Sequence, residues 1–297
     1  MIKLPFGVEI NNLIDDLRTL SWEAADVLLY YSKIIKNSEQ KFNIIKNDDN
    51  EDPVTLADLK VNQLIINRIR ENYHNTNWEI LSEENFKTKS NNCDINSDWL
   101  WVLDPLDGTK DFIQGTANYA MHLALNYRQS PIIGVVLIPE RNELWISFGQ
   151  KVWCEKRKGD IKKVNLSQNN IFEEMVIVTS KNHRNEKLKQ LIHQINFKKV
   201  VVMGSIGCKL ASILRGESDI YISLSLPGKG GPKDWDFAAP QAILKAAGGA
   251  ITDINNNDLV YGKGNLEHNG IIVASNNKEK HNVFCKKIKE TIKNYSI

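Results

Sequence analysis

The sequence predicts a mixed α/β fold, on three observations of its hydrophobic pattern. Residues 8–35 carry apolar side chains at helical spacing, which predicts a long amphipathic helix packed on a sheet. Residues 119–155 hold short apolar runs separated by turn residues, which is typical of an antiparallel meander. From residue 175 onward, strand-like and helix-like segments alternate, and this alternation favours a partly parallel α/β unit.

A polar stretch at residues 165–170 separates these two patterns. We therefore expect two halves, residues 1–168 with an α+β pattern and residues 169–297 with an α/β pattern.

Composition and charge indicate an ordinary globular chain. The 297 residues are 42% hydrophobic and 25% charged, and the net charge is +2, so nothing indicates nucleic-acid binding. No apolar run reaches about 18 residues and the N-terminus lacks a signal-peptide pattern, so we expect a cytoplasmic protein without a membrane span. The four cysteines form no Cys-x-x-Cys pair, which favours reduced thiols.

In the first half, the N-terminal helix is followed by a polar, acidic segment at 46–53 that we expect to be a surface loop. A second helix opens at Val54-Thr-Leu-Ala-Asp58. A short strand at 78–82 then ends in Glu83-Glu84, and a hydrophilic loop is expected to residue 98. The pattern predicts further strands at residues 99–103, 119–127, 132–138, 143–147 and 152–155.

In the second half, Gly and Pro residues punctuate shorter segments. The pattern predicts strands at 175–179, 199–203 and 219–224, and helices at 185–195, 208–215 and 235–247.

The stretch Asp104-Pro-Leu-Asp107-Gly-Thr109 follows the apolar strand at 99–103. Pro105 has no N–H group for a strand ladder, so we expect the strand to stop there and a helix to open near Lys110. Two carboxylates around such a turn suit divalent cations, and the N–H groups at a helix start suit a phosphate. The alternative is a simple strand end with Asp107 as a helix N-cap.

Other acidic residues occur in the same setting, beside a turn or at a helix start. They are Asp58, the pair Glu83-Glu84, and Asp236 within Lys233-Asp-Trp-Asp-Phe-Ala-Ala239. Several convergent carboxylates raise one another's pKa, and a bound magnesium ion would remove that cost.

Four motifs together resemble those of the magnesium-dependent inositol monophosphatase superfamily. They are Val54-Thr-Leu-Ala-Asp58, Ser82-Glu-Glu84, Asp104-Pro-Leu-Asp-Gly-Thr109 and Trp235-Asp-Phe-Ala-Ala239, and they occur in the family's order. The resemblance implies the family's layered α-β-α-β-α sandwich, with most metal ligands in the first half.

The resemblance also implies roles for individual residues. Glu83, Asp104 and the carbonyl of Leu106 would hold one magnesium ion, and Asp104, Asp107 and Asp236 a second. Glu83 would also contribute to a third, weaker ion through waters.

By the same resemblance, Thr109 with Asp58 would position and deprotonate the attacking water, and Gly108 and Thr109 would bind the phosphate. Two or three magnesium ions would supply the remaining chemistry of phosphomonoester hydrolysis, so no histidine or cysteine nucleophile is required. His122, inside a predicted strand, is interpreted as a packed core residue.

Within the superfamily, the chain is most similar to the 3′(2′),5′-bisphosphate nucleotidase (CysQ-type) branch. The stretches that carry this similarity are Asp107-Gly-Thr-Lys-Asp-Phe-Ile113, Thr179-Ser-Lys-Asn-His183, Met203-Gly-Ser-Ile-Gly-Cys-Lys209 and Lys233-Asp-Trp-Asp-Phe-Ala-Ala-Pro240. By that similarity, Ser180, His183, Ser205 and Lys209 are candidates for contacts with a nucleotide. The alternative is that Lys209 is a solvated helix residue and His183 a surface loop residue.

Two departures bear on the substrate. Residues 226–233 contain no acid of the kind that contacts ring hydroxyls in inositol phosphatases, and they contain two lysines instead. Ile206-Gly207 stands where some nucleotidases have Ser-Ser, which puts the finer contacts in doubt.

The resemblance thus implies a magnesium-dependent hydrolase that removes the 3′-phosphate of adenosine 3′,5′-bisphosphate, with the 3′-phosphoadenylyl sulfate donor as an expected second substrate, in sulfate assimilation. The partner is a small phosphorylated nucleotide. An inositol-1-phosphate or fructose-1,6-bisphosphate phosphatase is the alternative within the class, and a non-catalytic nucleotide-binding protein is the alternative outside it. The sequence leaves open a monomer or a homodimer.

Overall fold

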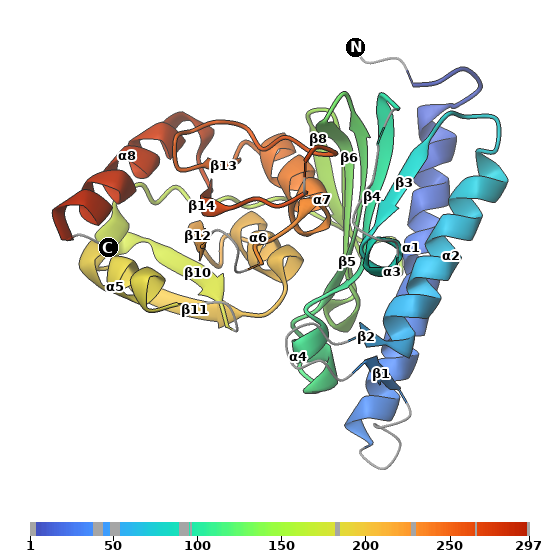
Figure 1. Ribbon diagram of the computed structural model, residues 1–297, viewed down its shortest axis with the longest axis horizontal. Coiled ribbons are helices and arrows are strands. Elements are labelled where there is room, and N and C mark those ends of the chain that lie inside the picture. The colour runs from blue at the N-terminus through green and yellow to red at the C-terminus, as the bar shows by residue number, and fades with distance from the viewer. Residues whose placement is uncertain are drawn as a thin grey trace.

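The protein forms five layers in the order helix, sheet, helix, sheet, helix (Figure 1). The computed structural model describes residues 4–37, 44–47, 54–88, 95, 97–181, 185–226, 230–264 and 266–295. The expected layered α-β-α-β-α sandwich is confirmed.

The first layer contains α1 (Ile10–Lys36) and α2 (Leu56–Asn72), which pack against one face of the larger sheet (Figure 1). Thr55 caps α2, because its hydroxyl accepts a hydrogen bond from the N–H group of Ala57. The short strands β1 (Ile45–Asn47) and β2 (Val54–Thr55) pair antiparallel before this helix. Residues 46 and 47 were expected in a surface loop but belong to β1, and residues 48–53 lie outside the described part.

The larger sheet has seven strands in chain order, and only its first two are parallel to each other. Its strands are β3 (Glu79–Ser82), β4 (Trp99–Asp107), β5 (Ala120–Tyr127), β6 (Ser130–Ile138), β7 (Glu143–Phe148), β8 (Lys151–Glu155) and β9 (Ile161–Lys162). A 3₁₀ helix, η2 (Pro139–Arg141), joins β6 to β7. The expected antiparallel meander is therefore present.

Two expectations for this half are wrong in detail. Strand β4 does not stop before Pro105 but continues to Asp107. It does so through a shift in register, since Asp104 pairs with His122 on β5 and Asp107 pairs with Ala120. Three steps on β4 thus face two on β5, which is a bulge that accommodates a proline without a ladder donor.

The second correction concerns the residues after Ser82. They form the helix α3 (Glu83–Thr88) where a loop was expected.

The smaller sheet has five strands in the order β11-β10-β12-β14-β13. Strand β10 is parallel to both of its neighbours, whereas β14 is antiparallel to both of its own. The elements of this half are η3 (Phe172–Glu174), β10 (Val176–Ser180), α5 (Glu186–Ile195), β11 (Lys199–Met203), α6 (Ile206–Leu214), β12 (Ile220–Ser225), α7 (Asp234–Ala246), β13 (Ala250–Asp253), β14 (Gly270–Ser275) and α8 (Lys278–Tyr295). The sequence did not predict the last three of them.

Helices α6 and α7 form the middle layer, and their apolar side chains contact both sheets. Alternate residues of β4 point to opposite faces, so Leu100 and Val102 face the middle layer whereas Trp101 and Leu103 face α1 and α2. Helices α5 and α8 cover the outer face of the smaller sheet. The division into residues 1–168 and 169–297 stays a prediction.

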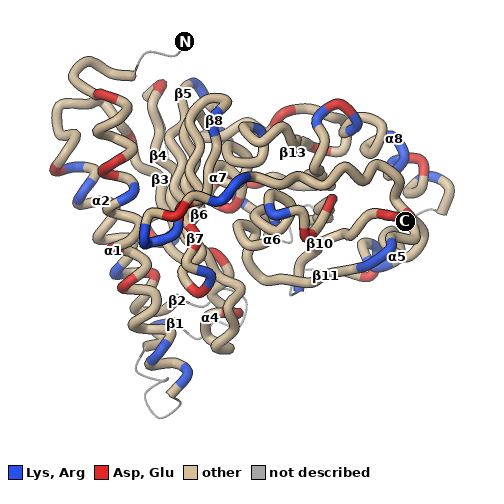
Figure 2. The backbone as a smooth tube through the Cα atoms, turned by 180° about the vertical axis from the view of Figure 1, so that it is seen from behind, with Lys and Arg blue, Asp and Glu red and all other residues tan. Residues whose placement is uncertain are grey.

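Charged residues of both signs are interspersed along both halves (Figure 2), which agrees with the small net charge. Among the described residues, no helix combines the length and hydropathy needed to cross a bilayer. Cys154, Cys208 and Cys285 are free thiols, as expected, and Cys93 lies outside the described part.

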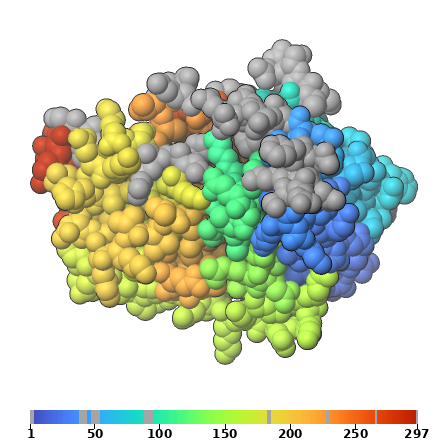
Figure 3. All heavy atoms as spheres, turned by 90° about the horizontal axis from the view of Figure 1, so that it is seen from below, coloured from blue at the N-terminus to red at the C-terminus, as the bar shows by residue number. Residues whose placement is uncertain are grey.

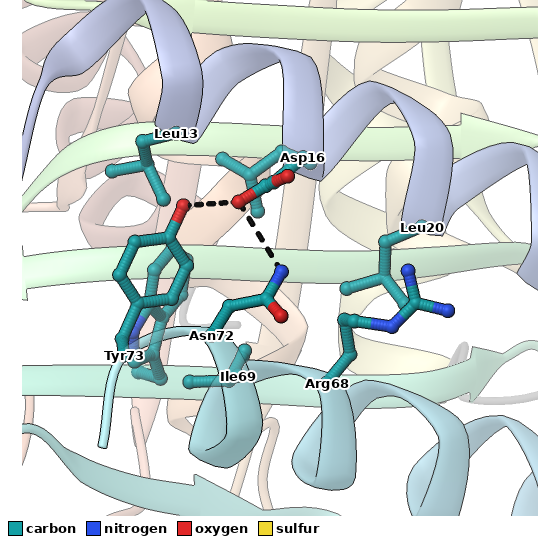
Figure 4. A pocket seen from close by; sticks show the side chains of 9 residues that line it. Leu13, Asp16, Leu20, Arg68, Ile69, Asn72 and Tyr73 are labelled. Atoms are coloured by element: carbon teal, nitrogen blue, oxygen red, sulfur yellow. Dashed lines mark hydrogen bonds between the residues drawn. The ribbon is translucent and has the colours of Figure 1, made fainter.

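A small cavity of about 10 Å³ lies between α1 and α2 (Figure 4). Beside it, Asp16 accepts hydrogen bonds from the Tyr73 hydroxyl at 2.6 Å and the Asn72 amide at 3.3 Å. The cavity is large enough for about one water molecule, so it is not a candidate for a substrate site.

A buried polar network anchors α8 to the smaller sheet. His281 is 1% exposed, and its two ring nitrogens lie 2.8 Å from the Thr252 hydroxyl and 2.7 Å from the Ser275 hydroxyl. Burial lowers the pKa of His281 to about 4. The folded protein therefore binds this proton less readily than the unfolded chain does.

We predict that acid destabilises the fold through His281. The stability that neutral His281 contributes is fully present above the unfolded-chain pKa of 6.5 and is lost as the pH falls towards 4. This loss lowers the free energy of unfolding by up to roughly 3 kcal/mol. Urea unfolding at several pH values should show a smaller loss for His281→Gln, whereas His193→Gln, on the exposed face of α5, should keep the original dependence. Parallel curves for His281→Gln and the unsubstituted protein would contradict the prediction.

Candidate active site

Asp104 and Asp107 lie at the bulged end of β4. Asp104 is 2% exposed, and its Oδ1 accepts a hydrogen bond from the Leu106 N–H group at 3.0 Å. Gly108 then takes a left-handed backbone, with φ of 91°, and ends the strand ahead of the short helix α4 (Thr109–Ile113). A side chain at Gly108 would meet the Asn118 carbonyl at 2.8 Å, so the turn requires glycine for both conformation and space. The N-cap of α4 is Gly108, so the alternative of Asp107 as N-cap is wrong.

Asp236 comes to the same place from the second half, on the first turn of α7. The Lys233 N–H group donates to its Oδ2 at 2.6 Å, which fixes the carboxylate at the helix N-terminus. Ligand oxygens of Asp104, Asp107 and Asp236 all lie within 4.8 Å of one another. Residues more than a hundred positions apart thus form one cluster, because α7 packs across β4 and β5.

The cluster concentrates negative charge away from water. Burial, followed by the charges of Glu83, Asp107 and Asp236, raises the pKa of Asp104 well above its usual value. Burial and then the charge of Asp107 raise the pKa of Asp236 to about 7. Closely spaced carboxylate oxygens of this kind fit a hard divalent cation, which would stabilise all three in their ionised form.

Asp107 differs from the other two carboxylates. Burial alone would raise its pKa, but His122, Lys209 and the Ser205 hydroxyl together lower it. Its Oδ2 accepts hydrogen bonds from the Ser205 hydroxyl at 2.6 Å and the Gly207 N–H group at 3.0 Å. Both donors belong to the start of α6, so this carboxylate joins the two halves.

Asp58 and Thr109 form a pair beside this cluster. Asp58 is 1% exposed, and its Oδ2 accepts from the Thr55 N–H group at 2.8 Å as part of the capping box of α2. Its other oxygen, Oδ1, lies 3.5 Å from the Thr109 hydroxyl, which also donates to the Leu106 carbonyl at 2.9 Å. Burial, with smaller effects of Glu84 and Glu83, raises the pKa of Asp58 to about 8.

Glu83 begins α3 and contacts the side chain of Asp104. A cation that the sequence did not indicate lies beside it, since Lys87 Nζ is 3.0 Å from Glu83 Oε1 and 3.6 Å from Glu84 Oε1. This lysine was overlooked because its segment was expected to be a loop, whereas one helical turn brings it back over Glu83.

The structure places the nucleotide candidates differently from one another. Ser180 ends β10 and is 6% exposed. Ser205 is fully buried as the N-cap of α6. Lys209 is 1% exposed, and its ammonium donates to the Gly204 carbonyl at 2.7 Å and the Met203 carbonyl at 3.4 Å. His183 lies outside the described residues.

Lys209 is thus not the solvated helix residue of the alternative interpretation. The contact of all four side chains with a nucleotide stays a prediction.

Two further residues were not singled out as functional from the sequence. His122 is buried as expected, but its Nε2 lies 3.1 Å from Asp107 Oδ2.

The second residue is Asp111, on α4, which is fully buried. It lies so close to Gly204 that a Cβ on Gly204 would be 2.0 Å from Asp111 Oδ2. Lys181 lies 3.4 Å from Asp111 and donates to Gln114 at 2.7 Å, so α4 contacts the second half here (Figure 3). The sequence contained one signal for each contact. His122 is a histidine within an apolar strand, and Asp111 is an acid within the stretch that follows Asp107.

Comparison with known proteins identifies the family of this chain. The profile of the inositol monophosphatase family matches residues 12–293. The chain belongs to the inositol monophosphatase family.

Relatives of this family are similar to almost the whole chain. A protein of Buchnera aphidicola named 3′(2′),5′-bisphosphate nucleotidase CysQ is 31% identical over 267 residues, covering 88% of this chain and 93% of its own. The protein of the same name from Escherichia coli K12 is 26% identical and covers 84% and 94%. The solved structure of an IMPase from Thermotoga maritima superposes with a TM-score of 0.70 at 22% identity, covering 95% and 99%.

Family membership and the site together support a phosphatase. The family is generally metal-dependent, and the cluster of Asp104, Asp107 and Asp236 has the oxygen ligands that such chemistry needs.

We predict that Asp104→Asn leaves the protein at least as stable as the unsubstituted chain without added Mg²⁺, because it removes one of three crowded charges. It should also abolish stabilisation by Mg²⁺, which at about a hundred times the dissociation constant amounts to roughly 2.7 kcal/mol. Thermal unfolding with and without Mg²⁺ measures both effects, and Asp160→Asn, at an exposed site, should keep the full Mg²⁺ response. A normal Mg²⁺ response in Asp104→Asn would show that Asp104 holds no cation.

Proposed function

We propose that this protein is a magnesium-dependent phosphomonoesterase that removes the 3′-phosphate of adenosine 3′,5′-bisphosphate to give AMP. The 3′-phosphoadenylyl sulfate donor carries the same 3′-phosphate and is the proposed second substrate, so the enzyme would serve sulfate assimilation. The observation that carries the proposal is the Asp58–Thr109 pair beside the cluster of Asp104, Asp107 and Asp236. The relatives named CysQ, similar along most of their length, support the nucleotide as substrate.

The acidic residues divide into two ligand sets that share Asp104. Glu83, Asp104 and the Leu106 carbonyl would hold one magnesium ion, while Asp104, Asp107 and Asp236 would hold another. Bound magnesium supplies charge neutralisation for the phosphate and the leaving oxygen and increases the acidity of water. Glu83 also contacts Lys87, which already neutralises part of its charge.

The chain's own proton acceptor is Asp58. Its Oδ1 faces the Thr109 hydroxyl, and its Oδ2 is held by Thr55, so only Oδ1 is oriented to accept a further proton. In the proposed reaction Thr109 Oγ1 orients the attacking water. As the water oxygen bonds to phosphorus and the P–O3′ bond breaks, a proton passes from the water to Asp58 Oδ1, and the leaving 3′-oxygen takes up a proton from solvent. A pKa raised to about 8 by burial makes Asp58 a stronger base than an exposed carboxylate.

The phosphate would lie over the turn at Gly108 and Thr109, where backbone N–H groups begin α4. The nucleotide would extend towards the second half, where Ser180, His183, Ser205 and Lys209 are the proposed contacts. Ser205 and Lys209 are buried, so their proposed influence on the substrate includes their hold on Asp107 and on the Met203-Gly204 carbonyls.

We predict that Mg²⁺-dependent phosphate release is at least about a hundredfold faster, in kcat/KM, with adenosine 3′,5′-bisphosphate than with inositol 1-phosphate or fructose 1,6-bisphosphate. Such a ratio corresponds to roughly 2.7 kcal/mol of differential transition-state binding. The measurement compares the three esters at equal concentration. Equal or faster hydrolysis of either sugar phosphate would support the alternative and overturn the nucleotide assignment.

We also predict that Asp58→Asn abolishes turnover while the protein still binds Mg²⁺ and nucleotide. The amide keeps the capping contacts of α2 but cannot accept the proton, so kcat should fall by about 10²–10⁴. Phosphate release and calorimetric binding of adenosine 3′,5′-bisphosphate separate the two effects. Asp98→Asn, at an exposed surface pair, is the matched control. Turnover of Asp58→Asn within about tenfold of the unsubstituted protein would rule out the proposed proton acceptor. An unsubstituted protein that binds nucleotide without any turnover would be a binding protein.

A further inference from the structure

Gly207 lies inside helix α6, where its backbone does not require glycine. The helix spans Ile206–Leu214, and Gly207 is not among the glycines with positive φ. Glycine in a helix costs about 1 kcal/mol relative to alanine, so another reason must account for it here.

The reason is space, and His122 occupies it. A Cβ on Gly207 would lie 2.2 Å from His122 Nε2 and 2.9 Å from Val136 Cγ1. The imidazole therefore fills the volume that any side chain at position 207 would need. The two residues come from different halves, since His122 belongs to β5 and Gly207 to α6 (Figure 1).

The imidazole makes polar contacts on both sides. Nδ1 lies 3.2 Å from the Trp235 carbonyl on α7, which can only accept a hydrogen bond, so Nδ1 carries the proton. Nε2 lies 3.1 Å from Asp107 Oδ2, which also can only accept, so Nε2 holds this carboxylate as an ion pair when it carries a second proton. His122 is fully buried. Through these two contacts it touches β4 and α7, the two elements that bring Asp107 and Asp236 together.

Asp107 is fully engaged on one side only. Oδ2 accepts from the Ser205 hydroxyl and the Gly207 N–H group and lies against His122. No hydrogen bond to Oδ1 is found among the described residues, so Oδ1 is the oxygen that is open to a cation. A change at Oδ2 would rotate the carboxylate and move Oδ1 relative to Asp104 and Asp236.

We propose that His122 and Gly207 form a positioning pair that holds Asp107 by its Oδ2, so that Oδ1 faces the proposed cation site. The inference rests on the proposed metal-dependent function, and it goes beyond it by assigning a role to two residues that are not ligands. Simple packing does not account for the pair, because an apolar residue at 122 would remove the side-chain donor to the Trp235 carbonyl and the polar neighbour of Asp107.

The pair makes a reciprocal prediction for substitutions. His122→Asn should weaken Mg²⁺ binding about tenfold, the usual effect of removing a residue that orients a ligand, while kcat at saturating Mg²⁺ changes less. Gly207→Ser should weaken it at least as much, because the new side chain displaces the imidazole. His122→Ser combined with Gly207→Ser should recover affinity to within about threefold of the unsubstituted protein, since the smaller residue at 122 makes room for a hydroxyl beside Asp107.

The test is calorimetric titration of Mg²⁺ into the full chain, together with the Mg²⁺ concentration for half-maximal phosphate release and the thermal unfolding midpoint. His281→Gln is the control, because it removes a buried histidine far from the cluster and should leave Mg²⁺ affinity unchanged while lowering the midpoint.

Unchanged Mg²⁺ affinity in His122→Asn, or an equal loss in His281→Gln, would overturn the inference and leave the proposed function intact. If Gly207→Ser does not fold, His122→Asn alone decides the question. If the unsubstituted protein neither binds Mg²⁺ nor hydrolyses phosphomonoesters, the proposed function fails, and the inference fails with it.

Discussion

Burial of like charges at the junction of the two halves is the constraint on which this structure depends. Asp104 and Asp107 come from the end of β4, Asp236 comes from α7, and their oxygens approach within 4.8 Å. Water screens this repulsion poorly at buried positions, so the surrounding structure must compensate for it. The five layers achieve the approach because α7 packs on β4 and β5 while it also contacts the smaller sheet.

Hydrogen-bond donors and positive charges are distributed unevenly around the three carboxylates, so their pKa values differ. Asp107 has donors and positive charge around it, from His122, Lys209 and the start of α6, and its pKa is lowered. Asp104 and Asp236 have fewer such neighbours, and their pKa values are raised. A bound cation would therefore stabilise the cluster most between Asp104 and Asp236, where the protein itself provides the fewest donors and positive charges.

The fold could be predicted to a large extent from the sequence, because hydrophobic periodicity and turn residues are local signals. The helices α1 and α2, the meander and the alternation in the second half were all expected. Two details were wrong, because Pro105 predicted too early an end for β4 and the hydrophilic composition after Ser82 predicted a loop where α3 forms. The elements after residue 249 were missed. The four acidic motifs indicated which residues converge, since chemistry of this kind leaves Asp, Glu, Gly and Thr at recognisable spacings.

By itself, the sequence determined the family, the layered architecture and the acidic residues of the candidate site, because each depends on residue type and order along the chain. Only the tertiary structure decided the surroundings of those residues. That Gly207 is required for space, that His122 lies against Asp107, and that Lys209 is buried on backbone carbonyls all depend on contacts between segments distant in sequence. Periodicity determines which face of a helix or strand is buried, but the identity of the neighbour on that face is settled only when β5, α6 and α7 pack together.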